Sequence, residues 1–307
     1  MILKMIPKYE KLFDDEVKKF ISISASFTGK SPSDSIEEMR KNYNEMVEHF
    51  RQARPSNVKT EDKKVEFKER TLIYRHYSKS ANNNSDLIYF HGGGFVLGGL
   101  ESHDDVCAAV GDITGCNVFS LDYSLAPEVR YPEFFLDAIR FYYFIKNPER
   151  RLILMGDSAG GTLAGFVSSK VRNVAIRPDA QVLIYPDLAG QISYRVKRQF
   201  WDAPLLTKND IDFYHKCAGL PLELGLHDLI GNFDHDNMPK TLIVSAEVDP
   251  LAQDCQIYSE SLKRHGCDIT FLEGIGLPHG FLRARNVSEK ARTIFDKTMK
   301  FIIQTLC

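Results

Sequence analysis

The sequence predicts a doubly wound α/β fold built on a mostly parallel, eight-stranded sheet. It contains eight short runs rich in apolar and β-branched residues, helical patterns separate most of the later runs, and several runs are apolar at every position. Strands that alternate with helices are typical of a parallel sheet with helices on both faces, where strands are buried on both sides. The predicted strands are residues 65–67, 72–77, 87–90, 118–121, 152–155, 182–185, 242–245 and 269–272.

Two kinds of element complete the predicted core. The first two strands have no helix between them, so we expect an antiparallel pair at the sheet edge. The later strands are linked by helical patterns near residues 103–114, 133–146, 159–172, 252–265 and 288–304.

Two further segments are helical without belonging to the alternation. Apolar residues within 12–21 and 36–50 repeat at helical spacing, and the second pattern follows a Ser/Pro/Asp-rich helix start. From about 190 to 225 there is no strand signal, only aromatic residues spaced with basic ones. We expect a helical cap made of residues 1–60 and 190–225, on a core made of residues 61–189 and 226–307.

Composition excludes several functional classes. In 307 residues, 39 Lys and Arg oppose 41 Asp and Glu, which leaves a net charge of -2 and no electrostatic reason to expect nucleic acid or an anionic membrane. The six cysteines are scattered and predict reduced thiols, not disulfides or a zinc site. No signal peptide and no span of about 18–20 apolar residues is present, which predicts a cytoplasmic protein.

The strand at 152–155 runs into Gly156-Asp-Ser-Ala-Gly160, and a helical pattern follows. A G-x-S-x-G sequence between a strand and a helix is typical of a nucleophile elbow, where a sharp turn exposes the serine and the glycines let strand and helix approach. The alternative is a Gly-rich turn with an incidental serine. The setting favours Ser158 as nucleophile.

The strand at 87–90 ends in His91-Gly-Gly-Gly-Phe95. Successive glycines leave backbone N–H groups open to a substrate oxygen, and such a loop pairs with the N–H after the nucleophile in an oxyanion hole. We therefore expect the donors to be Gly93, Gly94 and Ala159. A phosphate-binding loop fails on spacing, because Leu97 stands where a third glycine is needed. His91 is expected to hold the loop, not to act as a base.

In this kind of site the acid and then the base follow the serine along the chain. Asp249 comes directly after the strand at 242–245, and Asp254, one turn into the next helix, is the competitor. Among histidines beyond Asp249, His265 ends a helix, whereas His279 lies in a Gly/Pro-rich segment, 273–280, predicted to be a mobile loop. We expect Asp249 to orient His279, and His279 to activate Ser158.

These motifs resemble those of the hormone-sensitive-lipase-like esterases, and within them the bacterial acetyl esterases. The resemblance rests on the two glycine-containing motifs above, Asp249-Pro-Leu251 and His279-Gly-Phe281, with Asp122-Tyr-Ser-Leu-Ala-Pro-Glu128 as a lesser match, in family order between about 87 and 281. It implies an α/β-hydrolase with a helical cap that hydrolyses short-chain acyl esters (acetyl to butanoyl) without a metal or cofactor.

Two other functions remain open. One is a lipase for longer acyl chains, which usually needs an exposed apolar helix that is not evident here. The other is a non-catalytic ligand-binding or regulatory protein of the same fold. The expected partner is a small-molecule ester, with neither nucleic acid nor membrane, and the chain could be a monomer or a homodimer.

Overall fold

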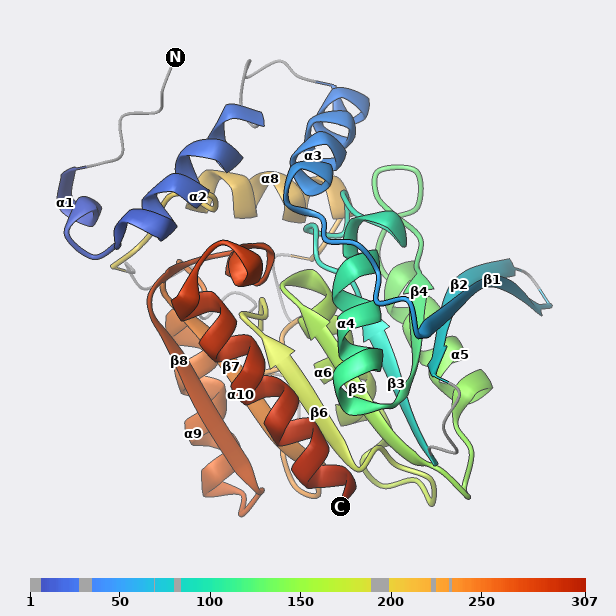
Figure 1. Ribbon diagram of the computed structural model, residues 1–307. Helices are drawn as coiled ribbons and strands as arrows, with labels where there is room; N and C mark the ends of the chain where they lie inside the picture. The colour runs from blue at the N-terminus through green and yellow to red at the C-terminus, as the bar shows by residue number, and fades with distance from the viewer. Residues whose placement is uncertain are drawn as a thin grey trace.

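The computed structural model describes residues 7–27, 35–68, 70–79, 84–188, 199–221, 225–231 and 234–307 (Figure 1). Its centre is an eight-stranded sheet with the order β1-β2-β4-β3-β5-β6-β7-β8. The strands are β1 (Val58–Phe67), β2 (Arg70–Lys79), β3 (Ser85–Phe90), β4 (Asn117–Asp122), β5 (Arg151–Asp157), β6 (Ala180–Ile184), β7 (Lys240–Val248) and β8 (Ile269–Pro278). Each overlaps one predicted run, so the predicted strands are confirmed.

The pairing directions confirm the predicted fold class. β1 pairs antiparallel with β2, and β2 antiparallel with β4, while the other neighbours are parallel. Every residue of β3 and β6 is buried, as a central parallel strand requires, whereas β1 has only two buried positions. The first two strands therefore form the antiparallel pair expected at the sheet edge.

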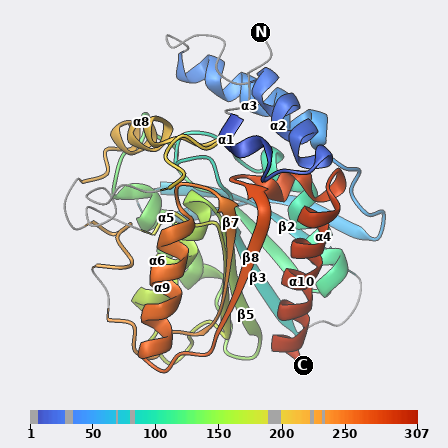
Figure 2. The same cartoon turned by 90° about the vertical axis from the view of Figure 1, so that its left-hand side faces the viewer.

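Helices cover both faces of the sheet, and Figure 2 shows the two layers edge-on. One face is covered by α4 (Asp104–Thr114) and α10 (Glu289–Leu306). The other is covered by α5 (Glu133–Ile145), α6 (Ala159–Val171) and α9 (Ala252–Arg264). Because side chains alternate along a strand, β3 sends its residues into two separate cores, one under each layer.

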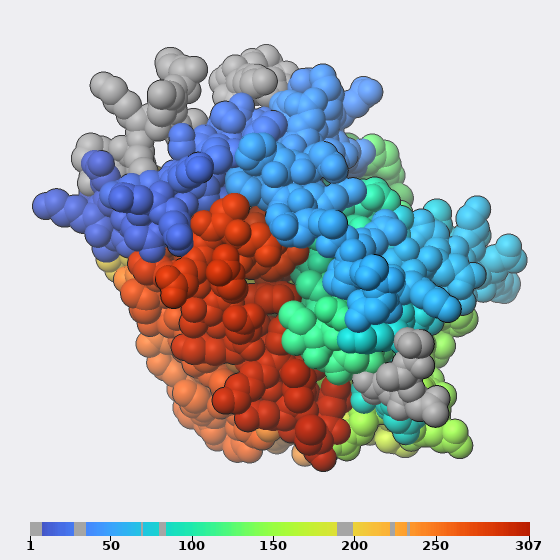
Figure 3. All heavy atoms as spheres, viewed as in Figure 1, coloured from blue at the N-terminus to red at the C-terminus, as the bar shows by residue number. Residues whose placement is uncertain are grey.

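A third group of helices lies beyond the carboxyl ends of the parallel strands (Figures 1 and 2). It contains α1 (Pro7–Glu10), α2 (Asp15–Phe27), α3 (Ile36–Phe50) and α8 (Lys208–Ala218). In Figure 3 the blue N-terminal helices cover that end of the red and green core. We call α2, α3 and α8 the cap helices. Residues 190–198 and 222–224 of the predicted insertion, and residues 1–6 and 28–34 of the N-terminal part of the predicted cap, lie outside the described residues.

Local sequence explains how α3 begins and how it is held. The side chain of Ser35 caps the helix by accepting a hydrogen bond from the Glu38 N–H at 3.1 Å. Arg40 then reaches the core: its guanidinium donates to the Val96 and Ala126 carbonyls at 2.9 and 2.8 Å and forms a two-pronged pair with Glu128. The guanidinium thus ties a cap helix to the loops that follow β3 and β4.

The prediction of a loop over 273–280 is wrong for residues 273–278, whereas His279 and Gly280 form a turn. β8 continues through Pro278, and its residues up to Gly274 and again Pro278 pair with β7 across a register irregularity. Gly276 has a φ of 68°, and its N–H donates to Glu247 at 2.6 Å. Gly276 therefore shapes an irregular strand end, because glycine adopts a left-handed backbone without strain.

Candidate active site

Ser158 lies on a strained turn between β5 and α6. Its φ of 52° and ψ of -124° are unusual for a residue with a side chain. The turn is tight: a Cβ on Gly160 would lie 2.0 Å from the Phe90 carbonyl oxygen, and one on Gly156 would lie 2.3 Å from the Gly160 carbonyl oxygen. The Ser158 N–H donates to the Ile184 carbonyl at 2.9 Å. Neighbouring strands thus fix a conformation that projects the hydroxyl beyond the sheet.

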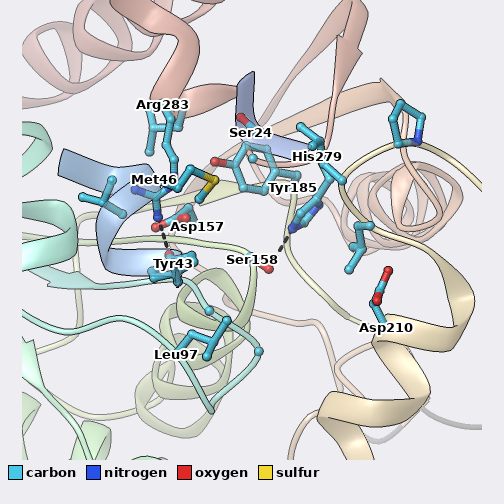
Figure 4. Close-up of a pocket in the computed structure, with 18 of the residues that line it drawn as sticks. Ser24, Tyr43, Met46, Leu97, Asp157, Ser158, Tyr185, Asp210, His279 and Arg283 are labelled. Atoms are coloured by element: carbon cyan, nitrogen blue, oxygen red, sulfur yellow. Dashed lines mark hydrogen bonds between the residues drawn. The ribbon is translucent and has the colours of Figure 1, made fainter. Parts of the chain in front are cut away.

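A hydrogen-bonded chain connects three side chains that are distant in sequence. The Ser158 Oγ lies 3.0 Å from His279 Nε2, and His279 Nδ1 lies 2.7 Å from Asp249 Oδ2 (Figure 4). Since a carboxylate can only accept, Nδ1 carries the proton and Nε2 is free to accept the serine proton. The other carboxylate oxygen of Asp249 accepts the Leu251 N–H at 2.8 Å. The structure therefore brings together Ser158, His279 and Asp249.

The two sequence alternatives lie elsewhere. Asp254 is buried within α9, and the described carboxylate partner of His279 is Asp249. His265 is exposed at the end of α9, where its ring bonds the Ser261 carbonyl at 2.8 Å. Neither lines the cavity above Ser158.

The glycine loop after β3 lines the same cavity as Ser158, through Gly93 and Gly94, and Ala159 lines it from the start of α6. Gly93 has a φ of 128°, and its carbonyl accepts the N–H groups of Val96 and Leu97, which turns the loop sharply. A Cβ at Gly93 would lie 2.1 Å from the Leu97 carbonyl oxygen. The three predicted donors therefore border one space with the hydroxyl, and the loop tolerates no side chain at Gly93.

His91 is bound inside this loop. Its Nδ1 lies 2.9 Å from the Gly92 carbonyl, and its ring stacks on Tyr123 with 4.2 Å between ring centroids. Burial, with a smaller contribution from His103, lowers the pKa of His91 to about 3. The imidazole is therefore neutral at neutral pH, in an arrangement that suits a structural residue.

Asp157 is a residue of the candidate site that sequence reasoning did not single out. It is buried directly beside the nucleophile, and its Oδ1 accepts from the Tyr89 hydroxyl at 2.7 Å and from the Gly92 N–H at 3.1 Å. Burial alone would raise the pKa of Asp157, but His103 and the Tyr89 hydrogen bond outweigh it and hold the pKa well below its ordinary value. The carboxylate thus joins the glycine loop to the nucleophile turn. An acidic residue at the end of an otherwise apolar strand was the available signal.

A cavity of about 1210 Å³ opens above these groups, between the core and the cap helices. Most of its lining is apolar, and a few polar groups come from both sides. The apolar side chains from the cap include Phe20, Ile21, Met39, Met46, Val47, Phe50, Ile211 and Phe213. A space of this size with a reactive hydroxyl at its floor suits a small organic molecule.

Two further observations bear on metals and membranes. Among the described residues, Asp234, Asp236 and His265 stand close enough to share an ion, but all are exposed and none lines the cavity. Within the described part of the chain, no helix combines the length and hydrophobicity that crossing a bilayer requires.

Comparison with known proteins gives consistent results. A family model described as alpha/beta hydrolase fold matches residues 87–283. The chain is 29% identical over 292 residues to an acetyl esterase of Salmonella choleraesuis, covering 90% of each chain. Among solved structures, a carboxylesterase cloned from a metagenomic library is 26% identical with a TM-score of 0.80, covering 90% of this chain and 99% of that one. A Pyrobaculum calidifontis esterase, 24% identical with a TM-score of 0.85 and 95% and 98% coverage, shares the fold.

Proposed function

The chain belongs to the family of the alpha/beta hydrolase fold, and from this premise we propose that it is a serine esterase hydrolysing short-chain acyl esters, acetyl to butanoyl, through an acyl-enzyme intermediate. The resemblance drawn from the sequence motifs is confirmed, and so is the enzyme class: the chain is a carboxylic ester hydrolase. The substrate range and the mechanism are the proposal.

One observation supports the mechanism above all others, the continuous hydrogen-bonded chain from Asp249 through His279 to Ser158. In the first step the Ser158 oxygen attacks the ester carbonyl carbon while His279 Nε2 takes the hydroxyl proton. Asp249 holds the imidazole in the required tautomer and stabilises the charge it gains. His279 then returns the proton to the departing alcohol, and the acyl group stays on Ser158.

The negative oxygen formed in this step needs donors. We assign this role to the N–H groups of Gly93, Gly94 and Ala159, which border the cavity beside Ser158. One such donor is typically worth about 3 kcal/mol in the transition state. In the second half of the reaction, water attacks the acyl-enzyme with His279 again accepting a proton, which releases the acid and restores Ser158. The proposed steps use only these groups and water.

The substrate range depends on the cap. We propose that residues 1–60 and 190–225 form it and that its apolar walls limit the acyl group. The cavity is larger than an acetyl group needs, so the remaining space would hold the alcohol half or a longer acyl chain. This volume is the observation that keeps a lipase for longer chains as the second candidate.

The test compares purified wild type with Ser158→Ala on p-nitrophenyl esters from acetyl to decanoyl. Wild type should release p-nitrophenol, with kcat/KM falling steeply between butanoyl and decanoyl esters, and the variant should show only background release. Mass spectrometry after a rapid acid quench should find an acyl group on the peptide that contains Ser158. Equal rates for both proteins would favour the non-catalytic alternative, and a rate maximum at decanoyl would favour the lipase. The cytoplasmic location and the oligomeric state stay predictions.

A further inference from the structure

Charged and polar side chains line the cavity on both sides of Ser158. In Figure 4, Ser24, Tyr43 and Arg283 lie on one side of Ser158, and Asp210 lies on the other. Asp210 belongs to α8. Asp187 and Asp202 also line the cavity, but they are paired with His215 and Lys8. The end bordered by α2 and α3 holds the Arg283 guanidinium, which the proposed hydrolysis does not use, together with Asp157 and Asp105, which are already bonded within the protein.

Arg283 is the centre of this polar end. Its guanidinium donates to the Ser102 carbonyl at 3.3 Å and to the Tyr43 hydroxyl, both uncharged acceptors, and it lies 4.7 Å from the centroid of the Tyr43 ring. No carboxylate of the described residues lies within ion-pair distance of it. Arg285, two residues later, differs because it is paired with Asp105. A cation that lines a cavity without its own carboxylate can bind one from a ligand.

The nearest acidic neighbour does not serve as that partner. Asp157 is occupied by Tyr89, Gly92 and His103, and it influences Arg283 only through space. Burial would lower the pKa of Arg283, but Tyr43 and Asp157 outweigh it and raise the pKa, so the group stays protonated. The geometry thus keeps a positive charge at the cavity wall.

Two buried polar side chains of the cap helices also line the cavity. Ser24, on α2, is only 1% exposed, and its hydroxyl has no hydrogen-bond partner among the described residues although it lines the cavity. Asn42, on α3, is 6% exposed, also lines the cavity, and makes no side-chain hydrogen bond with any described residue. A buried hydroxyl without a partner costs stability, so such a group indicates a place where a ligand or water binds.

We propose that Arg283, Ser24 and Asn42 form an anion subsite that binds a carboxylate carried by the ester substrate. This inference rests on the proposed esterase function and narrows its substrate class to esters with a second, ionised acid group. Asp210, on the other side of Ser158, would repel the same group, so the subsite also orients the substrate over Ser158.

The experiment uses two matched pairs of esters, because the carboxylate could belong to either half of the substrate. Monomethyl glutarate is compared with methyl hexanoate, and γ-acetoxybutyrate with pentyl acetate, by titrating the acid released. For wild type, one carboxylate ester should exceed its neutral partner in kcat/KM by about tenfold, the size expected for a charged hydrogen bond. The pair that shows the preference identifies the half of the substrate that enters the subsite.

Variants test the residues. Arg283→Gln should reduce the ratio of kcat/KM for the carboxylate ester to that for its neutral partner to one or below. Ser24→Ala should reduce this ratio by a smaller factor, and it provides the test if Arg283→Gln fails to fold. Lys263→Gln removes the same charge from the exposed surface of α9 and should leave the ratio as in wild type. An equal fall in Lys263→Gln would overturn the subsite, since net charge would then explain the preference.

Two outcomes separate this inference from the proposed function. If wild type hydrolyses both neutral esters but neither carboxylate ester faster than its partner, the subsite is wrong and the esterase stands. Binding without turnover is measured by calorimetry on Ser158→Ala, titrated with the same four esters. If Ser158→Ala binds a carboxylate ester more tightly than the matched neutral ester, the subsite is supported even if wild type is inactive. Equal binding of the two esters refutes the subsite.

Discussion

The core and the cap helices contribute to the cavity in different ways. The three residues of the hydrogen-bonded chain lie at the ends of core strands, and hydrogen bonds fix the position of each: Ser158, Asp249 and His279. The cap helices contribute mainly apolar walls, and a few polar contacts such as those of Arg40 tie them to the core. In the proposed enzyme the core therefore supplies the groups that carry out the reaction, and the cap determines which esters reach Ser158.

This difference predicts two kinds of mutational effect. A change in the core should lower the rate for every ester or destabilise the fold, because its groups act on the reacting atoms or pack without free space. A change in a cap wall should alter the ratio of rates between esters. The predictions below test this contrast, starting with the largest expected effect.

Asp249→Asn should lower kcat by about 10⁴-fold for all esters, because an amide cannot hold the imidazole in the tautomer that accepts the serine proton. Steady-state kinetics with p-nitrophenyl acetate and butanoate measure it. Asp254→Asn is the matched control. Asp254 is buried as Asp249 is, but the carboxylate that bonds His279 is that of Asp249. A larger loss of kcat in the control would show that the assignment of the acid is wrong.

Gly160→Ala should destabilise the protein by at least about 3 kcal/mol, because its Cβ would overlap the Phe90 carbonyl, a backbone atom that cannot move aside cheaply. Urea unfolding measures the effect. Gly111→Ala is the control: it also lies in a core helix, but its Cβ would meet only ordinary contacts at 3.6 Å. Because alanine favours a helix more than glycine does, Gly111→Ala should stabilise by up to about 1 kcal/mol. Similar losses in both would contradict the steric argument.

The contrast between core and cap also explains how much the sequence could predict. The core features that the sequence predicted depend on short-range rules: apolar runs predicted all eight strands, and small residues around Ser158 predicted the turn. The order of acid and base along the chain limited the candidates, and positions beside strand ends, not within or at the end of a helix, selected Asp249 and His279 over Asp254 and His265. These patterns are local because a buried parallel strand or a tight turn restricts the residue types at each of its own positions.

Other features depend on distant partners and could not be read in the same way. Asp157 is adjacent to the nucleophile in sequence, but its role depends on Gly92 and Tyr89, which are more than sixty residues away. The segment at 273–280 has the composition of a loop, and its strand pairing depends on β7. Likewise, the cap helices show their apolar faces in sequence, but their orientation over the cavity is a matter of packing between elements.

Acid should destabilise the core before carboxylates begin to titrate. Burial lowers the pKa of His91 to about 3, so between pH 6.5 and that value the unfolded chain binds a proton that the folded chain does not. The stability from this group is complete above pH 6.5 and falls as the pH decreases. His91 alone should account for a loss of about 2 kcal/mol between pH 6.5 and 5.

Denaturant unfolding at several pH values measures this slope for wild type and His91→Asn. For each protein the free energy of unfolding at one pH is compared with that at another, so a loss of stability that the substitution causes at every pH cancels. The variant should depend less on pH in this range. If the two slopes agree, His91 is not the group whose burial makes the fold sensitive to acid. Burial also lowers the pKa values of His76, His227 and His235, so part of the slope should remain.

The smallest predicted effect concerns the cap wall. Met46 lies on α3, is 8% exposed and lines the cavity on the same side of Ser158 as Tyr43 (Figure 4). Met46→Ala removes a long apolar side chain and adds space for acyl carbons. The ratio of kcat/KM for octanoyl to butanoyl p-nitrophenyl esters should rise by about tenfold, the low end of what a hydrophobic pocket discriminates per methylene. Glu45→Ala, exposed on the same helix, should leave the ratio unchanged. If Met46→Ala instead lowers kcat/KM for both esters equally, α3 contributes to the reaction itself. The core would then not be the sole source of catalysis, and this helix would not act only in substrate selection.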